Sequence, residues 1–175
     1  MRKLQLRLLL SIVFAAAFIS TSFSQVVISQ VYGGGGNTGA TYTHDFIELF
    51  NRGTSPISLA GWSLQYASAT GTGNFGSSAN QITELPNVVL QPGQYFLVQQ
   101  AGGATGMALP TPDLIDPTSI SMAAGGGKVA LVNTTTPLGC NGSSTPCSVA
   151  SLATIVDLVG YGSSTNFYEG AGPTA

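Results

Sequence analysis

Seven short segments of the chain are rich in β-branched, aromatic and alternating apolar residues, and clusters of Gly, Pro, Ser, Thr and Asn separate them. The segments span residues 26–32, 45–51, 61–66, 81–85, 95–100, 128–133 and 154–160. No stretch of comparable length after residue 24 has the three- and four-residue apolar spacing of an amphipathic helix. About seven short strands with turn residues between them predict an all-β fold, an antiparallel sandwich or barrel.

Alternate residues of a strand point to opposite faces of its sheet, so the segments also predict which side chains are buried. In residues 61–66 (GWSLQY), Trp62 and Leu64 share one face, and the only tryptophan is expected at the centre of the core. In residues 45–51 (DFIELFN), apolar residues occur on both faces, which predicts a central strand with a loop covering its second face. Phe46 is expected to join Trp62 and Leu64 in the structural core.

The first 24 residues have the features of a secretory signal peptide. A basic start is followed by an apolar run over residues 8–19 and by small residues up to Ser24. A membrane-spanning helix needs about 20 apolar residues, and this run is shorter. We therefore expect an exported protein without a membrane span, with one domain over residues 25–175.

The predicted domain is acidic. Residues 25–175 contain two cationic side chains, Arg52 and Lys128, against seven carboxylates, a net charge of −5 with His44 neutral. Proteins bind nucleic acids largely through Lys and Arg side chains that neutralise the phosphates. Direct binding of DNA or RNA by this domain is therefore not expected.

Two glycine runs look like phosphate-binding loops but lack the residues around them that such loops need. Gly34, Gly36 and Gly39 have the G-x-G-x-x-G spacing of a dinucleotide site. That site also needs a helix after the last glycine and an acidic residue about 20 positions further on, whereas strand-like residues follow here. The second run, residues 125–129 (GGGKV), has Val129 where a phosphate-binding loop has Ser or Thr. Both runs are predicted to be loops between strands.

Few side chains after residue 24 could carry catalysis or bind a metal. His44 is the only histidine, and its neighbour Asp45 points the opposite way along a strand, so the two cannot act as a base and its orienting carboxylate. We expect His44 to be exposed on a loop and expect no catalytic residue in this domain. Asp113 and Asp116 lie in one proline-rich loop and are candidate calcium ligands, with turn-forming aspartates as the alternative. No other cofactor is expected.

Cys140 and Cys147 lie in a Gly-, Ser- and Pro-rich stretch with six residues between them. In an exported chain such a pair predicts a local disulfide. A zinc site would need two further ligands, and the only histidine is far away in the sequence.

The order of several short motifs resembles the lamin tail domain family. The motifs are FIELFNRG, GWSLQ, LQPGQYFLV and GGGKVALVN, in that order, and the resemblance covers roughly residues 26–162. It implies an immunoglobulin-like β-sandwich without an active site. It also implies structural roles for Glu48, Asn51, Gly61, Trp62, Pro92 and Gly93. The signal peptide and the cysteine loop depart from the nuclear members of the family and argue against a nuclear role.

The stretch YGGGGNTGATYTHDFIELFNRG resembles the version of this domain found at the N-terminus of exported nucleases and phosphatases. We therefore expect a non-catalytic module for binding or tethering, the accessory domain of a larger extracellular hydrolase. Its partner would be a downstream catalytic domain of the same polypeptide or an extracellular ligand. The alternative is a free-standing module that binds carbohydrate or a cell surface, because aromatic side chains in loop-like positions can stack on sugars. These aromatic residues are Tyr32, Tyr42, Phe167 and Tyr168.

Overall fold

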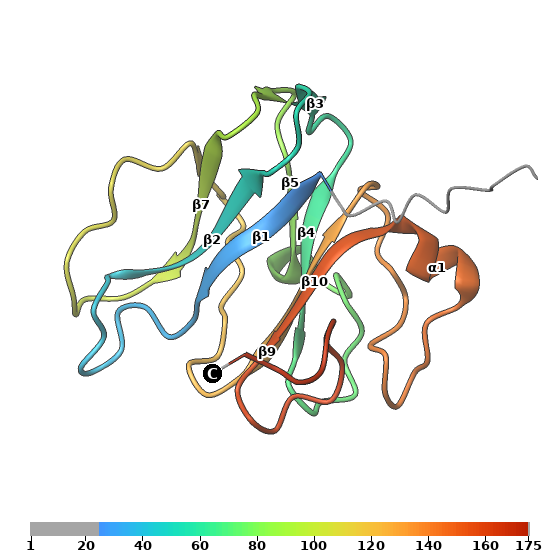
Figure 1. The fold of residues 1–175 in the computed structure, drawn as a ribbon. Coiled ribbons are helices and arrows are strands. Elements are labelled where there is room, and N and C mark those ends of the chain that lie inside the picture. Colours follow the sequence, from blue (N-terminus) through green and yellow to red (C-terminus); the bar gives the residue numbers. More distant parts are fainter. Residues whose placement is uncertain (1–24, 175) are drawn as a thin grey trace, which may run out of the picture.

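The computed structural model describes residues 25–174, so the predicted signal peptide lies outside the described residues. Two four-stranded sheets pack face to face (Figure 1). The first sheet has the order β1 (Val26–Tyr32), β2 (His44–Asn51), β7 (Tyr95–Gly102) and β8 (Leu114–Ile115). The second has the order β10 (Ile155–Tyr161), β9 (Gly127–Val132), β4 (Ser63–Ser68) and β5 (Ile82–Glu84). The predicted all-β sandwich is confirmed.

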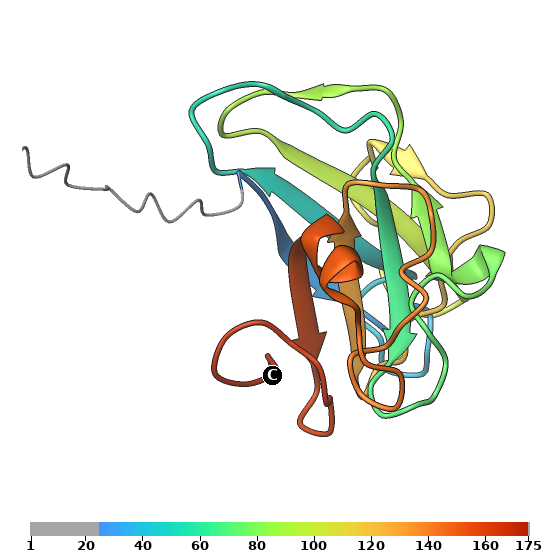
Figure 2. The same cartoon turned by 90° about the vertical axis from the view of Figure 1, so that its right-hand side faces the viewer.

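All seven predicted strands are present, with shifts of one or two residues at most of their ends. The elements that were not predicted are short. They are the β3 (Ile57–Ser58) and β6 (Val89–Leu90) pair, β8, a 3-10 turn η1 (Ala79–Gln81) and the helix α1 (Val149–Thr154). The side chain of Ser148 caps α1 by accepting a hydrogen bond from Ser151 N at 3.0 Å. Figure 2 shows α1 lying beside the second sheet.

The main core lies between the two sheets. It is built from the inward-facing apolar residues of both, among them Ile47 and Leu49 of β2 and Leu64 of β4. Leu64 is completely buried, as predicted. Trp62 is not the centre of the core, because it lies in the turn before β4 and only its half-buried ring packs against the cluster. The largest fully buried side chain is Phe75, which the sequence pattern did not indicate.

Phe46 is buried, but on the opposite face of the first sheet from this core. Its neighbours on β2, Asp45 and Ile47, face inward, and Phe46 contacts two tyrosine rings on the outside of the sheet. Phe46 is thus buried, as expected of a structural residue, but it does not belong to the cluster that contains Leu64. The prediction that a loop covers the second face of this strand is confirmed, because Tyr42, in the loop before β2, is one of the two rings.

The outer side of the second sheet carries a second buried cluster that contains polar side chains. Ser63 and Gln65 alternate with Leu64 on β4 and lie on the opposite face of the strand, yet both are completely buried. The loop after β9 covers them. Gln65 Nε2 donates to Thr136 O at 3.0 Å, and Gln65 Oε1 accepts from Leu138 N at 3.0 Å. The backbone of the loop thus provides hydrogen-bond partners for both the nitrogen and the oxygen of the buried Gln65 amide.

The segment after β10 folds back onto the sandwich. Phe167 packs edge-to-face on Phe75, with 6.3 Å between the ring centroids. Thr174 N donates to Gly160 O at 2.8 Å, and Gly162 N donates to Thr174 O at 2.9 Å. Residues 163–174 are therefore packed as part of the domain.

Candidate functional site

The outer face of the first sheet carries a group of aromatic side chains, of which Tyr95 is exposed and the others are half-buried or buried. The pairing of β1, β2 and β7 places three rows of side chains across it. A bulge at Ser29 of β1 keeps Gln30 and Tyr32 on this face. We call the rows the upper row (Tyr32, Phe46, Gln99), the middle row (Gln30, Glu48, Leu97) and the lower row (Val27, Phe50, Tyr95).

The upper row is an aromatic cluster held under two long loops. Tyr32 stacks on Phe46 with 5.4 Å between the centroids, and Tyr42 meets both rings edge-on. The Tyr32 hydroxyl accepts a hydrogen bond from Thr41 N at 2.8 Å, which ties the loop to the sheet. These edge-to-face and stacked arrangements are the ones that aromatic pairs prefer.

The two loops hold one another in place. The loop of residues 33–43 and that of residues 103–113 lie together at one end of the first sheet (Figure 1). Thr43 N donates to Met107 O at 2.9 Å, and Met107 N donates to Thr41 O at 2.9 Å. This backbone pairing fixes Tyr42 over the upper row and brings Leu109 and Pro110 to the middle row.

The lower row is open to solvent. Tyr95 is 54% exposed, and its ring lies 4.5 Å from that of Phe50, centroid to centroid, at an angle of 31°. The two residues face each other across β2 and β7. Together the two tilted rings form an aromatic surface at the opposite end of the sheet from the loops.

The middle row carries the polar groups of this face. A hollow of about 100 Å³ lies over Gln30 and Glu48, with Tyr42 and Phe46 on one side and Leu109 and Pro110 above. Glu48 is half-buried, and one of its carboxylate oxygens accepts from Ser29 Oγ at 2.7 Å. Glu48 was expected to be structural, but its place in this row makes it the acidic group of the candidate site.

Two of the four aromatic residues predicted for sugar stacking belong to this face, and two do not. Tyr32 and Tyr42 meet in the upper row. Phe167 turns inward onto Phe75, and Tyr168 lies against Gly160 at the edge of the second sheet. The sequence-based interpretation missed Tyr95 and Phe50, although the alternation in YFLVQQ and DFIELFN places both on the outer face.

The first glycine run binds a carboxylate of its own domain. Asp45 Oδ1 accepts from Gly35 N at 2.6 Å, and Asp45 Oδ2 accepts from Met122 N at 2.7 Å. Burial raises the pKa of Asp45, and these two backbone donors act in the opposite direction. The amides that could have met a phosphate are thus already occupied, so the run is a loop, as predicted.

His44 begins β2 and is half-buried, not exposed on a loop as expected. Its ring packs against the backbone of Gly102, because β2 and β7 pair as far as this residue. His44 Nδ1 lies 2.9 Å from Thr43 Oγ1. The carboxylate of Asp45 is directed to Gly35 and Met122 instead, so the two neighbours do not form a hydrogen-bonded pair.

Both predicted calcium ligands accept hydrogen bonds from the protein. Asp113 Oδ2 accepts from Leu97 N at 2.7 Å, and Asp116 accepts from Thr83 Oγ1 and from Thr118 N. Asp116 is 8% exposed, while Asp113 lies at the surface. Among residues 25–174, no three His, Cys, Asp or Glu side chains gather closely enough to hold a metal ion. Calcium binding at Asp113 and Asp116 stays a prediction.

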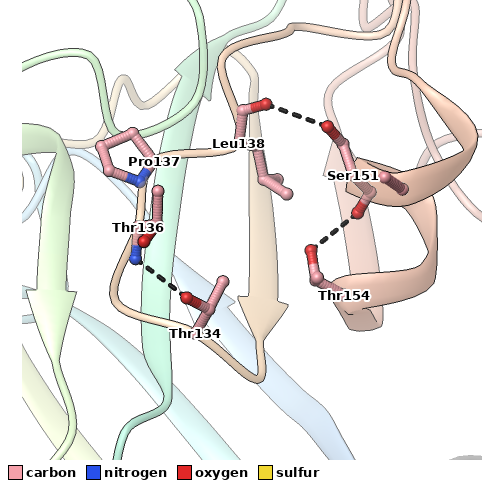
Figure 3. A pocket seen from close by; sticks show the side chains of 7 residues that line it. Thr134, Thr136, Pro137, Leu138, Ser151 and Thr154 are labelled. Atoms are coloured by element: carbon pink, nitrogen blue, oxygen red, sulfur yellow. Dashed lines mark hydrogen bonds between the residues drawn. The ribbon is translucent and has the colours of Figure 1, made fainter.

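A second hollow, of about 270 Å³, lies between the loop after β9 and α1 (Figure 3). Its polar groups are paired with one another. Thr136 N donates to Thr134 Oγ1 at 3.1 Å, and Thr154 Oγ1 donates to Ser151 O at 2.7 Å. No charged side chain lines this hollow, and the polar groups named above already have hydrogen-bond partners within the protein. The outer face of the first sheet is therefore the better candidate for a binding site.

The predicted disulfide is present. Cys140 and Cys147 are bonded, with their Cα atoms 5.0 Å apart. Cys140 is 2% exposed and belongs to the second buried cluster, so the bond anchors its loop to the outer side of the second sheet.

The sequence matches the model of a known protein family. The family model described as Lamin Tail Domain matches residues 19–163. The chain belongs to the lamin tail domain family. The two packed sheets are therefore the immunoglobulin-like sandwich of a lamin tail domain, as the motif order indicated. No curated protein matches the chain.

The family match ends at residue 163, whereas the folded segment continues to Thr174. This lamin tail domain thus carries a C-terminal segment, residues 164–174, that packs on the domain outside the matched region. No helix among the described residues has the length and apolar character needed to cross a membrane.

Proposed function

We propose that this lamin tail domain is an exported, non-catalytic module that binds an extracellular partner and tethers a larger hydrolase, a nuclease or a phosphatase, to it. Family membership supports a β-sandwich module. The disulfide supports folding outside the cytoplasm, where such bonds persist. The resemblance of the glycine-loop stretch to the domains of exported nucleases and phosphatases supports the hydrolase.

The single observation that carries the binding role is the open aromatic end of the outer face. Tyr95 and Phe50 lie side by side on a rigid sheet, and Tyr95 is 54% exposed. A contiguous apolar patch on the surface of a soluble protein, unlike a single exposed side chain, marks an interaction site. The backbone of β2 is fully paired with β1 and β7, so this surface would keep its shape on binding.

A reporter fusion tests the tethering role. The chain is fused to a reporter enzyme, exported by the organism from which the sequence comes, and the fraction of reporter retained on the cell envelope is measured. We expect retention by the wild-type fusion and its loss in Tyr95→Ala. Leu152→Ala is the matched control, because Leu152 is a 45% exposed apolar residue on α1, away from this face. Release of the wild-type fusion into the medium would overturn the tethering role.

Recognition of carbohydrate or another cell-surface ligand by a free-standing module is the second candidate. The same pair, Tyr95 and Phe50, favours it, because flat aromatic rings stack on the apolar faces of sugars. Both candidates use the outer face, and they differ in whether a catalytic domain is attached.

A further inference from the structure

We propose that the outer face of the first sheet binds an oligosaccharide that carries amino groups. The inference rests on the proposed binding function, since it names the ligand of the same surface.

The lower row offers a stacking position for a sugar. Tyr95 is 54% exposed and Phe50 beside it is half-buried, whereas Phe46 of the upper row is 8% exposed and lies under Tyr42. Phe50 and Glu48 are two residues apart on β2, which corresponds to roughly 7 Å along a strand. A sugar unit linked to one stacked on Tyr95 would therefore lie over the middle row, which suits an oligomer better than a single sugar.

The middle row lies next to this stacking position. Gln30 and Glu48 form the floor of the hollow of about 100 Å³, and Leu109 and Pro110 narrow it from above. The hollow is too small for a sugar ring but large enough for one exocyclic group that hangs from the chain. Gln30 can donate and accept hydrogen bonds, whereas Glu48 can only accept while it is ionised.

The charge of the face selects an amino group. The three rows contain no cationic side chain and one carboxylate, Glu48. Asp113 adds a second carboxylate beside Leu97 of the middle row. Of the two cationic side chains in the described part of the chain, Lys128 of β9 is completely buried on the outer side of the second sheet. Arg52 lines a hollow between β1 and β10 that also contains Asp157 and Glu169. An ammonium group over Glu48 would therefore meet complementary charge.

The backbone of the face disfavours an extended peptide. Peptides that bind along a sheet usually do so by pairing with an open strand edge. β2 and β7 are each paired on both sides, and β1 is the edge strand, so a peptide laid over Glu48 and the rings of β2 and β7 would meet only side chains. A peptide laid across the rings would leave its backbone groups without partners, whereas sugar hydroxyls lie around the rim of each ring and remain in water.

Calorimetric titration of residues 25–175 tests the proposal, with a β-linked glucosamine hexamer at a pH that keeps its amines protonated. We expect saturable binding that weakens about tenfold in both Glu48→Gln and Tyr95→Ala. Tyr95→Phe should bind like the wild type. Glu84→Gln is the charge-matched control, because Glu84 is an exposed carboxylate on β5 of the other sheet, and binding should be unchanged. Melting temperatures verify that each variant is folded.

Three results would overturn the proposal. Equal weakening by Glu84→Gln would show that the domain attracts any polycation. Equal or tighter binding of the N-acetylated hexamer would show that charge is not recognised. Binding of a lysine-rich peptide but not of the hexamer would show that the partner is a protein. If these results appear while the Tyr95→Ala reporter fusion still loses envelope retention, the ligand assignment fails and the tethering role stands.

Discussion

The side chains of Lys128 and Asn166 are joined by a hydrogen bond of 3.0 Å from Nζ to Oδ1, although the residues are 38 positions apart. Lys128 Nζ also donates to Asn141 O at 2.9 Å. Lys128 is completely buried, and burial lowers the pKa of its amine. Both acceptors lie in loops, so one buried side chain fastens the disulfide loop and the C-terminal segment to β9. The segment after residue 163, which the family match does not include, is thereby part of the folded domain.

Loss of the Asn166 side chain should therefore destabilise the whole domain. Asn166→Ala leaves the buried ammonium with one protein acceptor, and we expect the free energy of unfolding to fall by about 2 kcal/mol. Urea denaturation monitored by far-ultraviolet circular dichroism measures it. Ser164→Ala, at an exposed position in the same segment, is the control and should change stability by less than about 0.5 kcal/mol. Equal stability of the two variants would mean that the segment is only loosely attached.

Gly35 is fixed by contact with the neighbouring backbone. A methyl group at Gly35 would overlap the backbone of His44 and Asp45, so Gly35→Ala must push the glycine loop away from β2. We expect a loss of at least about 2 kcal/mol, because the Asp45 carboxylate also loses its bond from Gly35 N. Gly73→Ala has open space around it and serves as the control. Equal melting temperatures of the two variants would contradict the tight packing of this loop.

The disulfide should contribute modestly to stability. The bond closes a loop with a sequence separation of seven, for which chain entropy gives about 2.5 kcal/mol. We expect the Cys140→Ala/Cys147→Ala double variant to lose about this amount in guanidinium denaturation. The outer face of the first sheet lies on the other side of the sandwich, so binding there should persist. A variant that fails to fold at all would show that the loop directs folding of the second buried cluster.

Asp157 makes stability depend on pH. Burial, together with repulsion from Glu169, raises the pKa of Asp157 above its ordinary value of 3.8, while the bond from Ile28 N acts in the opposite direction. A carboxyl with a raised pKa contributes stability that is complete below pH 3.8 and is lost as the pH rises through the raised value.

We therefore expect Asp157→Asn to stabilise the domain near neutral pH, by about 0.5–1 kcal/mol, since the amide can still accept from Ile28 N without the charge. Melting temperatures over a pH series measure this, and the gain should vanish in acid, where Asp157 is itself protonated. A gain that is constant across the series would contradict the titration of Asp157.

Alternation and turn residues sufficed to predict the seven strands, and the cysteine spacing predicted the disulfide. They failed where long loops fold over the sheets. The burial of Gln65 depends on a loop about 70 residues away, of which strand alternation contains no information. Alternation placed Phe46 opposite Ile47 but could not show which of the two faces the other sheet. The outer-face pair Tyr95 and Phe50 was within reach of the pattern, but their adjacency depends on the register between β2 and β7, which only the structure gives.

We propose the outer face of the first sheet as the binding surface of this domain. It is tested most directly by adding soluble fragments of the cell envelope to ¹⁵N-labelled residues 25–175 and mapping the backbone amide shifts. We predict that the shifted amides cluster in β1, β2 and β7 around Gln30, Glu48 and Tyr95, and that Tyr95→Ala abolishes them. Shifts confined to the second sheet and α1, or an unchanged spectrum at saturating fragment concentration, would contradict the account.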